Sequence, residues 1–296
     1  MNLKLIILFA LTLPIISCFS SSSEIIPVID THIHFFDTER EEGIPWPSKT
    51  DKVLYKLTLP KDFKTIASEH HVKSAVVIQA SAWLIDNQWN LDITKGLGDK
   101  YPGVVGNLSS LGTPKFKEEI TTLSQNPRFV GVRITHRPEG RSFYTPAMIN
   151  DLKFLAHKKL TLSILYKRFT FDEINQIATD VPDLKIILDH LMGHKSLNDK
   201  SSYELETMAK HKNVYCKVSG IGDRTNEETK KILEKAWQEF GEDRLVYGSN
   251  WPCTKNIKDG YGIQKQFFTS FFKTKGETAL KKFFYNNAVQ FFNLKF

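Results

Sequence analysis

Residues 27–37, PVIDTHIHFFD, are the first of eight short apolar segments that decide the fold of this chain. Side chains on a strand alternate between its two faces with a period of two. We therefore expect Asp30, His32 and His34 to point the same way. Three polar side chains on one face of an apolar strand are costly to bury without partners. The segment thus predicts a strand that carries a polar site.

Seven more segments rich in Val and Ile follow, at residues 74–80, 104–111, 129–135, 160–166, 184–190, 214–220 and 244–250. Helical patterns separate them, at residues 62–71, 87–100, 115–125, 146–158, 171–180, 202–211, 227–240 and 263–292. Near-continuous apolar strands that alternate with helices indicate parallel strands covered on both faces. The count of eight favours a closed barrel over an open doubly wound sheet, and no GxGxxG turn follows the first strand. The sequence predicts a single α/β domain, a (β/α)8 TIM barrel, over residues 26–296.

The N-terminal region differs in kind from the rest of the chain. Lys4 precedes an apolar run of about a dozen residues, the length of a signal-peptide core. A small residue before Cys18, followed by a serine-rich stretch, resembles the lipobox of bacterial lipoproteins. We expect residues 1–17 to be a signal peptide, Cys18 to carry a lipid anchor, and residues 18–25 to form a tether. Plain secretion with cleavage nearby is the alternative, and either route exports the protein.

The composition is typical of a globular protein, with 41% hydrophobic and 25% charged residues and a formal net charge of +7. The basic residues are scattered as short pairs, and no basic block with interleaved aromatic residues occurs. We therefore expect a solvated surface and no nucleic-acid partner. Buried free thiols are expected at Cys216 and Cys253, although a disulfide between them stays open. The phenylalanine-rich stretch 263–292 is expected to pack against the outside of the barrel.

Polar residues stand near the ends of the predicted strands, where a barrel of this type carries its reacting groups. They are His32, His34, Gln79, Arg133, His136, His190, Lys217, Asn250 and Trp251. Two imidazoles spaced by one residue on a strand, with a third from another strand, are well placed to chelate one metal ion. The same groups could instead polarise a carbonyl by hydrogen bonds. The pattern predicts a small-molecule site, in which His32, His34 and His190 would hold a divalent ion such as zinc or manganese.

Five motifs in this order resemble the amidohydrolase superfamily: IDTHIHFFD, GVRI, IILDHLMG, CKVSG and RLVYGSNWP. They most resemble its amidohydrolase-related branch of TIM-barrel lactonases and metal-dependent hydrolases, over residues 26–292. The resemblance implies that His32, His34 and His190 bind a divalent ion or the substrate carbonyl. It also implies that Arg133 and Lys217 hold a carboxylate or hydroxyls of the substrate.

Asn250 departs from the pattern of this superfamily, which usually has an aspartate there as general base and often as metal ligand. An amide has no basic carboxylate, so it cannot take the proton of a water molecule at neutral pH. It can still orient that water. Another base, such as Asp37, Glu139 or His136, could act on a substrate that is already activated. Otherwise the protein hydrolyses slowly, or it binds a ligand without turnover.

We expect a hydrolase that opens a sugar-acid-like or carboxylated lactone by attack of water on the ring carbonyl. Its catalytic residues would be His32, His34, His190 and Asn250, and its substrate contacts Arg133, His136, Lys217, Gln79 and Trp251. The long loop 37–60 carries Trp46 and could act as a lid over the barrel mouth. Two alternatives remain. One is a non-catalytic, surface-anchored barrel that binds a small acid, and the other is a decarboxylase, whose metal site usually relies on the missing aspartate.

Overall fold

The computed structural model describes residues 26–107, 110–134, 144–166, 169–256 and 259–296. Its eight strands are β1 (Val28–Ile33), β2 (Val72–Ile78), β3 (Gly103–Asn107), β4 (Phe129–Ile134), β5 (Thr161–Ile164), β6 (Ile186–Leu188), β7 (Val214–Val218) and β8 (Leu245–Tyr247). They form one sheet in the order β1 to β8, and each strand pairs in parallel with the next. A bridge between Ile33 and Trp251 brings the last strand back to the first. The predicted TIM barrel is confirmed.

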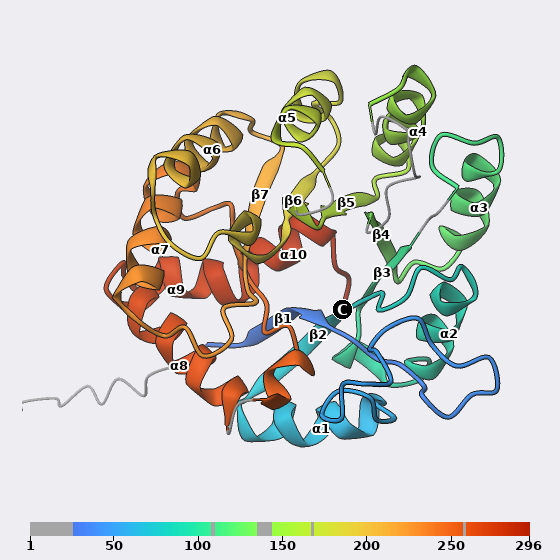
Figure 1. Ribbon diagram of the computed structural model, residues 1–296, viewed down its shortest axis with the longest axis horizontal. Coiled ribbons are helices and arrows are strands. Elements are labelled where there is room, and N and C mark those ends of the chain that lie inside the picture. Colours follow the sequence, from blue (N-terminus) through green and yellow to red (C-terminus); the bar gives the residue numbers. More distant parts are fainter. Residues whose placement is uncertain (1–25, 108–109, 135–143, 167–168, 257–258) are drawn as a thin grey trace, which may run out of the picture.

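Helices surround this sheet, as Figure 1 shows. They are α1 (Pro60–Glu69), α2 (Ile85–Ile93), α3 (Phe116–Leu123), α4 (Pro146–His157), α5 (Phe171–Asp180), α6 (Asp199–Lys210), α7 (Glu227–Phe240), α8 (Gly260–Lys273), α9 (Glu277–Lys281) and α10 (Asn287–Phe292). Most helices cover the strands with an apolar face; in α7 the buried residues include Ile232, Leu233, Ala236 and Phe240. The predicted helical stretch 263–292 is interrupted at Gly276, whose φ of 102° is a backbone conformation that favours glycine.

The apolar core has two parts, one between the sheet and the helices and one inside the barrel. Inward-facing residues of the strands form the second part, namely Ile29, Val76, Ile78, Val105, Val130, Ile187, Tyr215 and Val246. Phe291 and Phe292 of α10 pack among them, and Figure 1 shows α10 crossing one end of the barrel. The expectation that the whole phenylalanine-rich stretch packs outside the barrel is therefore wrong for α10. This helix plugs the barrel, where its two adjacent rings fill space among the inward-facing side chains, as the close packing of protein interiors requires.

An irregularity in β1 changes the direction of one polar side chain. Asp30 pairs with Ala75 and Ile33 with Val77, so β1 contains one residue more than β2 over the same span. Such a bulge breaks the alternation of side chains. His32 and His34 point into the barrel, whereas Asp30 bonds to Tyr261 of α8 on the outside. The expectation that all three share one face is wrong for Asp30.

The cysteines Cys216 and Cys253 are free thiols. The signal peptide, the anchor at Cys18 and the tether lie outside the described residues and stay predictions. His136 and Glu139 also lie outside them. Within the described part of the chain, no helix has the length and apolar character needed to cross a bilayer.

The α10 plug yields a stability prediction. Phe291→Ala should lower the free energy of unfolding by about 3–5 kcal/mol, because the fully buried ring would leave a cavity inside the barrel. Urea unfolding measures this change. Ile85→Ala is the control, since that side chain is 69% exposed and should change the same free energy by no more than about 0.5 kcal/mol. Equal small effects would show that α10 does not close the barrel.

Candidate active site

A buried carboxylate lies at the centre of the polar cluster. Asp189 directly follows β6 and is fully buried. Its Oδ2 accepts hydrogen bonds from Arg133 Nε of β4, at 2.9 Å, and from Ser163 Oγ of β5, at 3.0 Å. Lys217 Nζ of β7 lies 3.1 Å from Oδ1. The C-terminal ends of four neighbouring strands are thus joined through one side chain.

Burial acts to raise the pKa of Asp189, but Lys217 and Arg133 outweigh it and hold this pKa well below its usual range. The carboxylate is therefore ionised, and the pair of cations leaves the cluster with a net positive charge. Asp189 was not among the predicted site residues, although its place after an apolar strand and before His190 matches theirs. Arg133 and Lys217, expected to contact substrate, instead pair with this carboxylate.

The two histidines of β1 belong to a chain of hydrogen bonds. His34 Nδ1 lies 2.9 Å from the carbonyl oxygen of Ile78, so this nitrogen carries the proton. Lys217 Nζ lies 3.4 Å from His32 Nδ1, and a lysine ammonium donates but does not accept. Asp189 Oδ1 lies 3.7 Å from the same nitrogen of His32, and His32 Nε2 and His34 Nε2 are 3.2 Å apart. The chain runs from Lys217 through both imidazoles to a backbone carbonyl, and each nitrogen in it has a partner.

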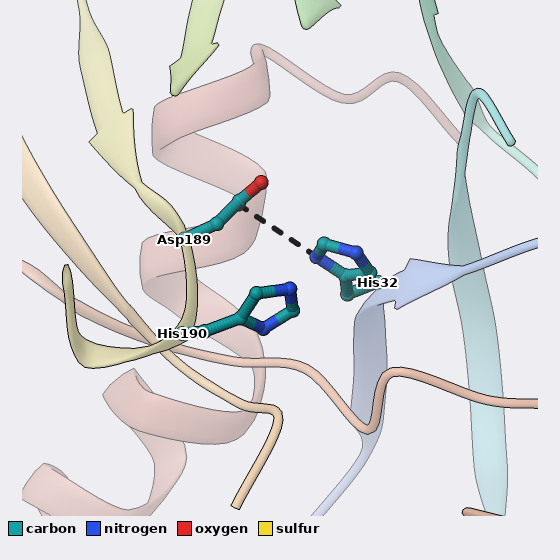
Figure 2. A group of neighbouring side chains, drawn as sticks. All are labelled: His32, Asp189 and His190. Atoms are coloured by element: carbon teal, nitrogen blue, oxygen red, sulfur yellow. Dashed lines mark ion pairs between the residues drawn. The ribbon is translucent and has the colours of Figure 1, made fainter. Parts of the chain in front are cut away.

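His190 stands beside His32, as Figure 2 shows, and the centroids of the two rings are 4.6 Å apart. It follows Asp189 in a tight turn and has a left-handed backbone, with φ of 58°. Its Nδ1 lies 2.8 Å from Ser219 Oγ, which leaves Nε2 available to another partner. Residue 220 must be glycine here, because a Cβ would lie 2.5 Å from His190 Nδ1.

Burial lowers the pKa of all three histidines, and the neighbouring cations lower it further. The pKa of His32 falls well below its ordinary value, that of His34 falls to about 4, and that of His190 to about 3. Lys217 acts most strongly on His32, and Arg133 on His34. All three imidazoles are therefore neutral at pH 7, the form that can accept a proton or bind a metal ion.

Asn250 lies on the seam between β8 and β1. Its backbone N–H donates to the carbonyl oxygen of His32 over 2.9 Å, and its side chain bonds to His34. Its φ of 64° is one that asparagine tolerates better than most residues. Trp46 of the loop 37–60 lies edge-on to His34, 5.4 Å between centroids, so this loop does reach the histidines.

Two predicted substrate contacts are buried in the structure. Trp251 is 2% exposed and packs against Phe35 and Phe63 in the apolar core. This placement corrects the expectation of a substrate contact there, because the large ring fills space between the sheet and α1. Gln79 is also buried, and its backbone N–H donates to the carbonyl oxygen of Val105, in the middle of β3.

A cavity of about 310 Å³ opens beside the cluster. Its walls are Leu165, Tyr166, Asp189, His190, Gly193, Lys195, Gly220, Arg224 and Asn250. Lys195 and Arg224 bring two further cations to this wall. They were not predicted, because they lie several residues beyond the ends of β6 and β7. A hollow of about 480 Å³ between α1 and the start of β2 is lined by none of these residues. The cavity at the cluster is therefore the candidate active site.

The family of this chain follows from a match over residues 29–294 to the model for amidohydrolases. The chain belongs to the amidohydrolase family, and a hydrolase is the class of protein that its fold and site define. It is 24% identical to an L-fucono-1,5-lactonase of Burkholderia ambifaria, over 77% of this chain and 81% of that one.

Three solved structures share the fold. An amidohydrolase of Burkholderia multivorans with bound zinc has a TM-score of 0.77 and 18% identity, covering 90% of this chain and 99% of that one. A probable 2-pyrone-4,6-dicarboxylic acid hydrolase of Acinetobacter baumannii has a TM-score of 0.69 and 19% identity, over 90% and 99%. A 5-carboxyvanillate decarboxylase of Novosphingobium aromaticivorans with manganese has a TM-score of 0.70 and 16% identity, over 92% and 97%.

Metal ions in these relatives raise the question whether this site fits one. Donor atoms of His32, Asp189 and His190 lie within 4.8 Å of one another, and Figure 2 shows the three side chains converging. However, Arg133, Ser163 and Lys217 already occupy both oxygens of Asp189. Lys217 Nζ also lies 3.4 Å from His32 Nδ1, the nitrogen that faces Asp189 Oδ1 at 3.7 Å. His32, Asp189 and His190 are thus a possible metal site, but a divalent ion there would compete with Arg133 and Lys217 for Asp189 and would add charge beside these two buried cations.

The neutral histidines predict how stability changes with pH. Because folding lowers the pKa of His34 to about 4 and of His190 to about 3, the unfolded chain binds more protons than the folded chain below pH 6.5. The two neutral histidines therefore make their full contribution to the free energy of unfolding above pH 6.5. This contribution is lost as the pH falls below that value. Burial raises the pKa of Asp30 to about 6, which works in the opposite direction between pH 4 and 6.

His190→Asn should reduce the slope of the free energy of unfolding by up to about 1.4 kcal/mol per pH unit. Asparagine suits the left-handed backbone at this position. Urea unfolding at pH 7, 6 and 5 gives the slope. His71→Asn is a matched control, because His71 is exposed and also has a positive φ, of 53°. Equal slopes in both variants would contradict a buried neutral His190.

Proposed function

We propose that the protein is a hydrolase that opens a lactone bearing a carboxylate or hydroxyl groups. The observation that carries this proposal is the set of three neutral imidazoles beside a buried cluster of net positive charge, at the mouth of the barrel. The likeness to an L-fucono-1,5-lactonase supports a lactone ring as the substrate. The dicarboxylic acid hydrolase among the structures of the same fold agrees with it.

His190 is the group we propose as general base. It lines the cavity together with Asn250, and its Nδ1 is already engaged by Ser219. A water held between His190 Nε2 and the Asn250 side chain would attack the ring carbonyl carbon while Nε2 takes its proton. The ring carbon–oxygen bond then breaks, and the proton passes from Nε2 to the leaving ring oxygen. Water is added across one ester bond, and nothing else is consumed.

Arg133 and Lys217 would assist this step through their charge. Negative charge develops on the carbonyl oxygen as water attacks, and it is stabilised by nearby cations in a buried site. Their common partner Asp189 neutralises one of the two, so a net positive charge faces the reacting atoms. With a pKa of about 3 the free imidazole is a weak base, and the proton it takes would be offset by the negative charge that develops on the carbonyl oxygen in the same step. A ring ester is more reactive than an amide and so makes a smaller demand on the base. This match explains why the site can work with Asn250 in place of an aspartate.

Lys195 and Arg224 point to the class of lactone. Both line the cavity, and among the described residues of its walls the one carboxylate is Asp189, which already pairs with Arg133 and Lys217. A carboxylate on the substrate would bind between them, and Arg224 is well suited because a guanidinium can hold a carboxylate with two hydrogen bonds. The proposed substrate is therefore an anionic lactone.

Release of acid from a panel of aldonolactones and carboxylated lactones, followed with a pH indicator, tests this function. We expect turnover of at least one anionic member. His190→Asn should lower kcat by about 100-fold or more, the range that general bases contribute. His71→Asn should retain wild-type activity. A folded protein that hydrolyses no member of the panel would favour the non-catalytic binding barrel.

Chelation tests the absence of a metal-dependent step. Dialysis against 1,10-phenanthroline and EDTA should leave kcat within about twofold of its starting value, because Lys217 occupies the place beside His32 and Asp189. Zinc or manganese added afterwards should not raise it. Loss of activity on chelation, restored by either metal, would contradict this part of the proposal.

A further inference from the structure

The candidate active site lies on the seam that closes the barrel. Asn250 N donates to His32 O and His34 N donates to Trp251 O, each over 2.9 Å. From β2 to β8, neighbouring strands pair over three or more consecutive residues, but among the described residues β1 meets the β8 end through the single bridge between Ile33 and Trp251. Few backbone contacts therefore fix Asn250 relative to the two histidines.

The side chain of Asp30 connects the two sides of this seam. Its carboxylate is fully buried, and Oδ1 accepts hydrogen bonds from His32 N, at 3.1 Å, and from Ser249 N, at 2.9 Å. One oxygen atom thus joins a histidine of the site to the residue before Asn250. The other oxygen, Oδ2, accepts from Tyr261 Oη of α8 at 3.0 Å.

The surroundings show how closely the two segments approach. A Cβ on Gly248 would lie 2.8 Å from His32 Cβ, so β8 passes β1 at backbone distance just before Ser249. The bulge in β1 turns Asp30 away from the barrel interior, and Asp30 does not line the cavity. Asp30 therefore touches no substrate and acts on the site through the backbones of His32 and Ser249.

We propose that Asp30 is a positioning residue, which sets the distance between the His32–His34 pair and Asn250 by holding both sides of the seam with Oδ1. The inference rests on the proposed function, because it concerns the geometry of that reaction. Loss of Oδ1 would leave two buried amides without an acceptor, and the segments would separate to find new partners. Displacements of about 1 Å in a reacting geometry can reduce turnover by about 100-fold.

Variants at Asp30 separate geometry from charge. Asp30→Asn keeps an oxygen for both amides and should keep kcat within about fivefold of wild type. Asp30→Glu keeps the charge but moves the oxygens by one methylene, and Asp30→Ala removes them; both should lower kcat by at least 10-fold. Tyr261→Phe removes the bond to Oδ2 alone and should leave kcat near wild type. If Glu is active and Asn is not, charge rather than position matters and the proposal is overturned.

Thr31→Val is the matched control for stability. Thr31 Oγ1 donates to the Tyr247 carbonyl oxygen across the same seam, at 2.5 Å, but holds neither His32 nor Ser249. It should lower the melting temperature without lowering kcat per folded molecule. If kcat per folded molecule stays at the wild-type value in Asp30→Ala and Asp30→Glu as well, Asp30 is merely structural and the proposal fails.

A readout that needs no turnover separates this proposal from the proposed function. Imidazole ¹⁵N resonances of His32 and His34 should shift in Asp30→Glu and stay in place in Thr31→Val, because the seam changes at the histidines in the first variant alone. If no lactone is hydrolysed but these shifts appear, the proposed function fails while the positioning stands. If the resonances do not move in Asp30→Glu, the positioning is wrong whatever the activity.

Discussion

The ion pairs of Asp189 with Arg133 and Lys217 are the interactions on which the rest of the site depends. They lie where β4, β6 and β7 end, with Ser163 of β5 as a further donor. Breaking a buried pair of this kind by removing one partner leaves an uncompensated charge, at a cost of about 3–5 kcal/mol. The polar centre therefore fixes the same strand ends that the apolar barrel brings together. Stability and the geometry of the site have a common origin here.

The protonation state of the histidines follows from this centre. Lys217 and Arg133 disfavour a third positive charge nearby, and burial disfavours it further, so the imidazoles stay neutral. A neutral imidazole can accept a proton from water, and the surplus positive charge can stabilise an oxyanion. The same surplus opposes a divalent ion. One electrostatic arrangement thus underlies both the proposed base and the proposed anionic substrate.

The proposed reaction also depends on where the barrel closes. His32 and His34 come from β1, Asn250 from the end of β8, and His190 from the turn after β6. Regular pairing along the sheet fixes β6 relative to its neighbours, whereas the β8–β1 seam relies on single hydrogen bonds and on Asp30. A substrate can reach such a site from the barrel mouth, but only a few side chains fix the relative positions of the site residues. Trp46 adds a cover over His34 from the loop 37–60.

Local pattern in the sequence was sufficient for the architecture. Eight apolar segments alternating with helices predicted the barrel, because a parallel strand buried on both faces must be apolar along its length. Strand ends also pointed to His32, His34, His190 and Asn250, since the carboxyl ends of barrel strands share one rim. These residues do meet in the structure. Apolar periodicity and polar residues at strand ends are local features, so both can be recognised from residues that are neighbours in the sequence.

Tertiary structure alone decided the features that depend on distant partners. The bulge in β1 reversed Asp30, because register is set by the strand alongside and not by β1 itself. Asp189 became the centre of the site because Arg133 and Lys217, 56 and 28 residues away by their numbers, reach it across the barrel. Phe291 and Phe292 lie at the barrel end, and Trp251 lies in the core between the sheet and the helices. Each side chain fills space that the packed elements leave open. Periodicity says that such a side chain is buried, and the packing of the whole barrel says where.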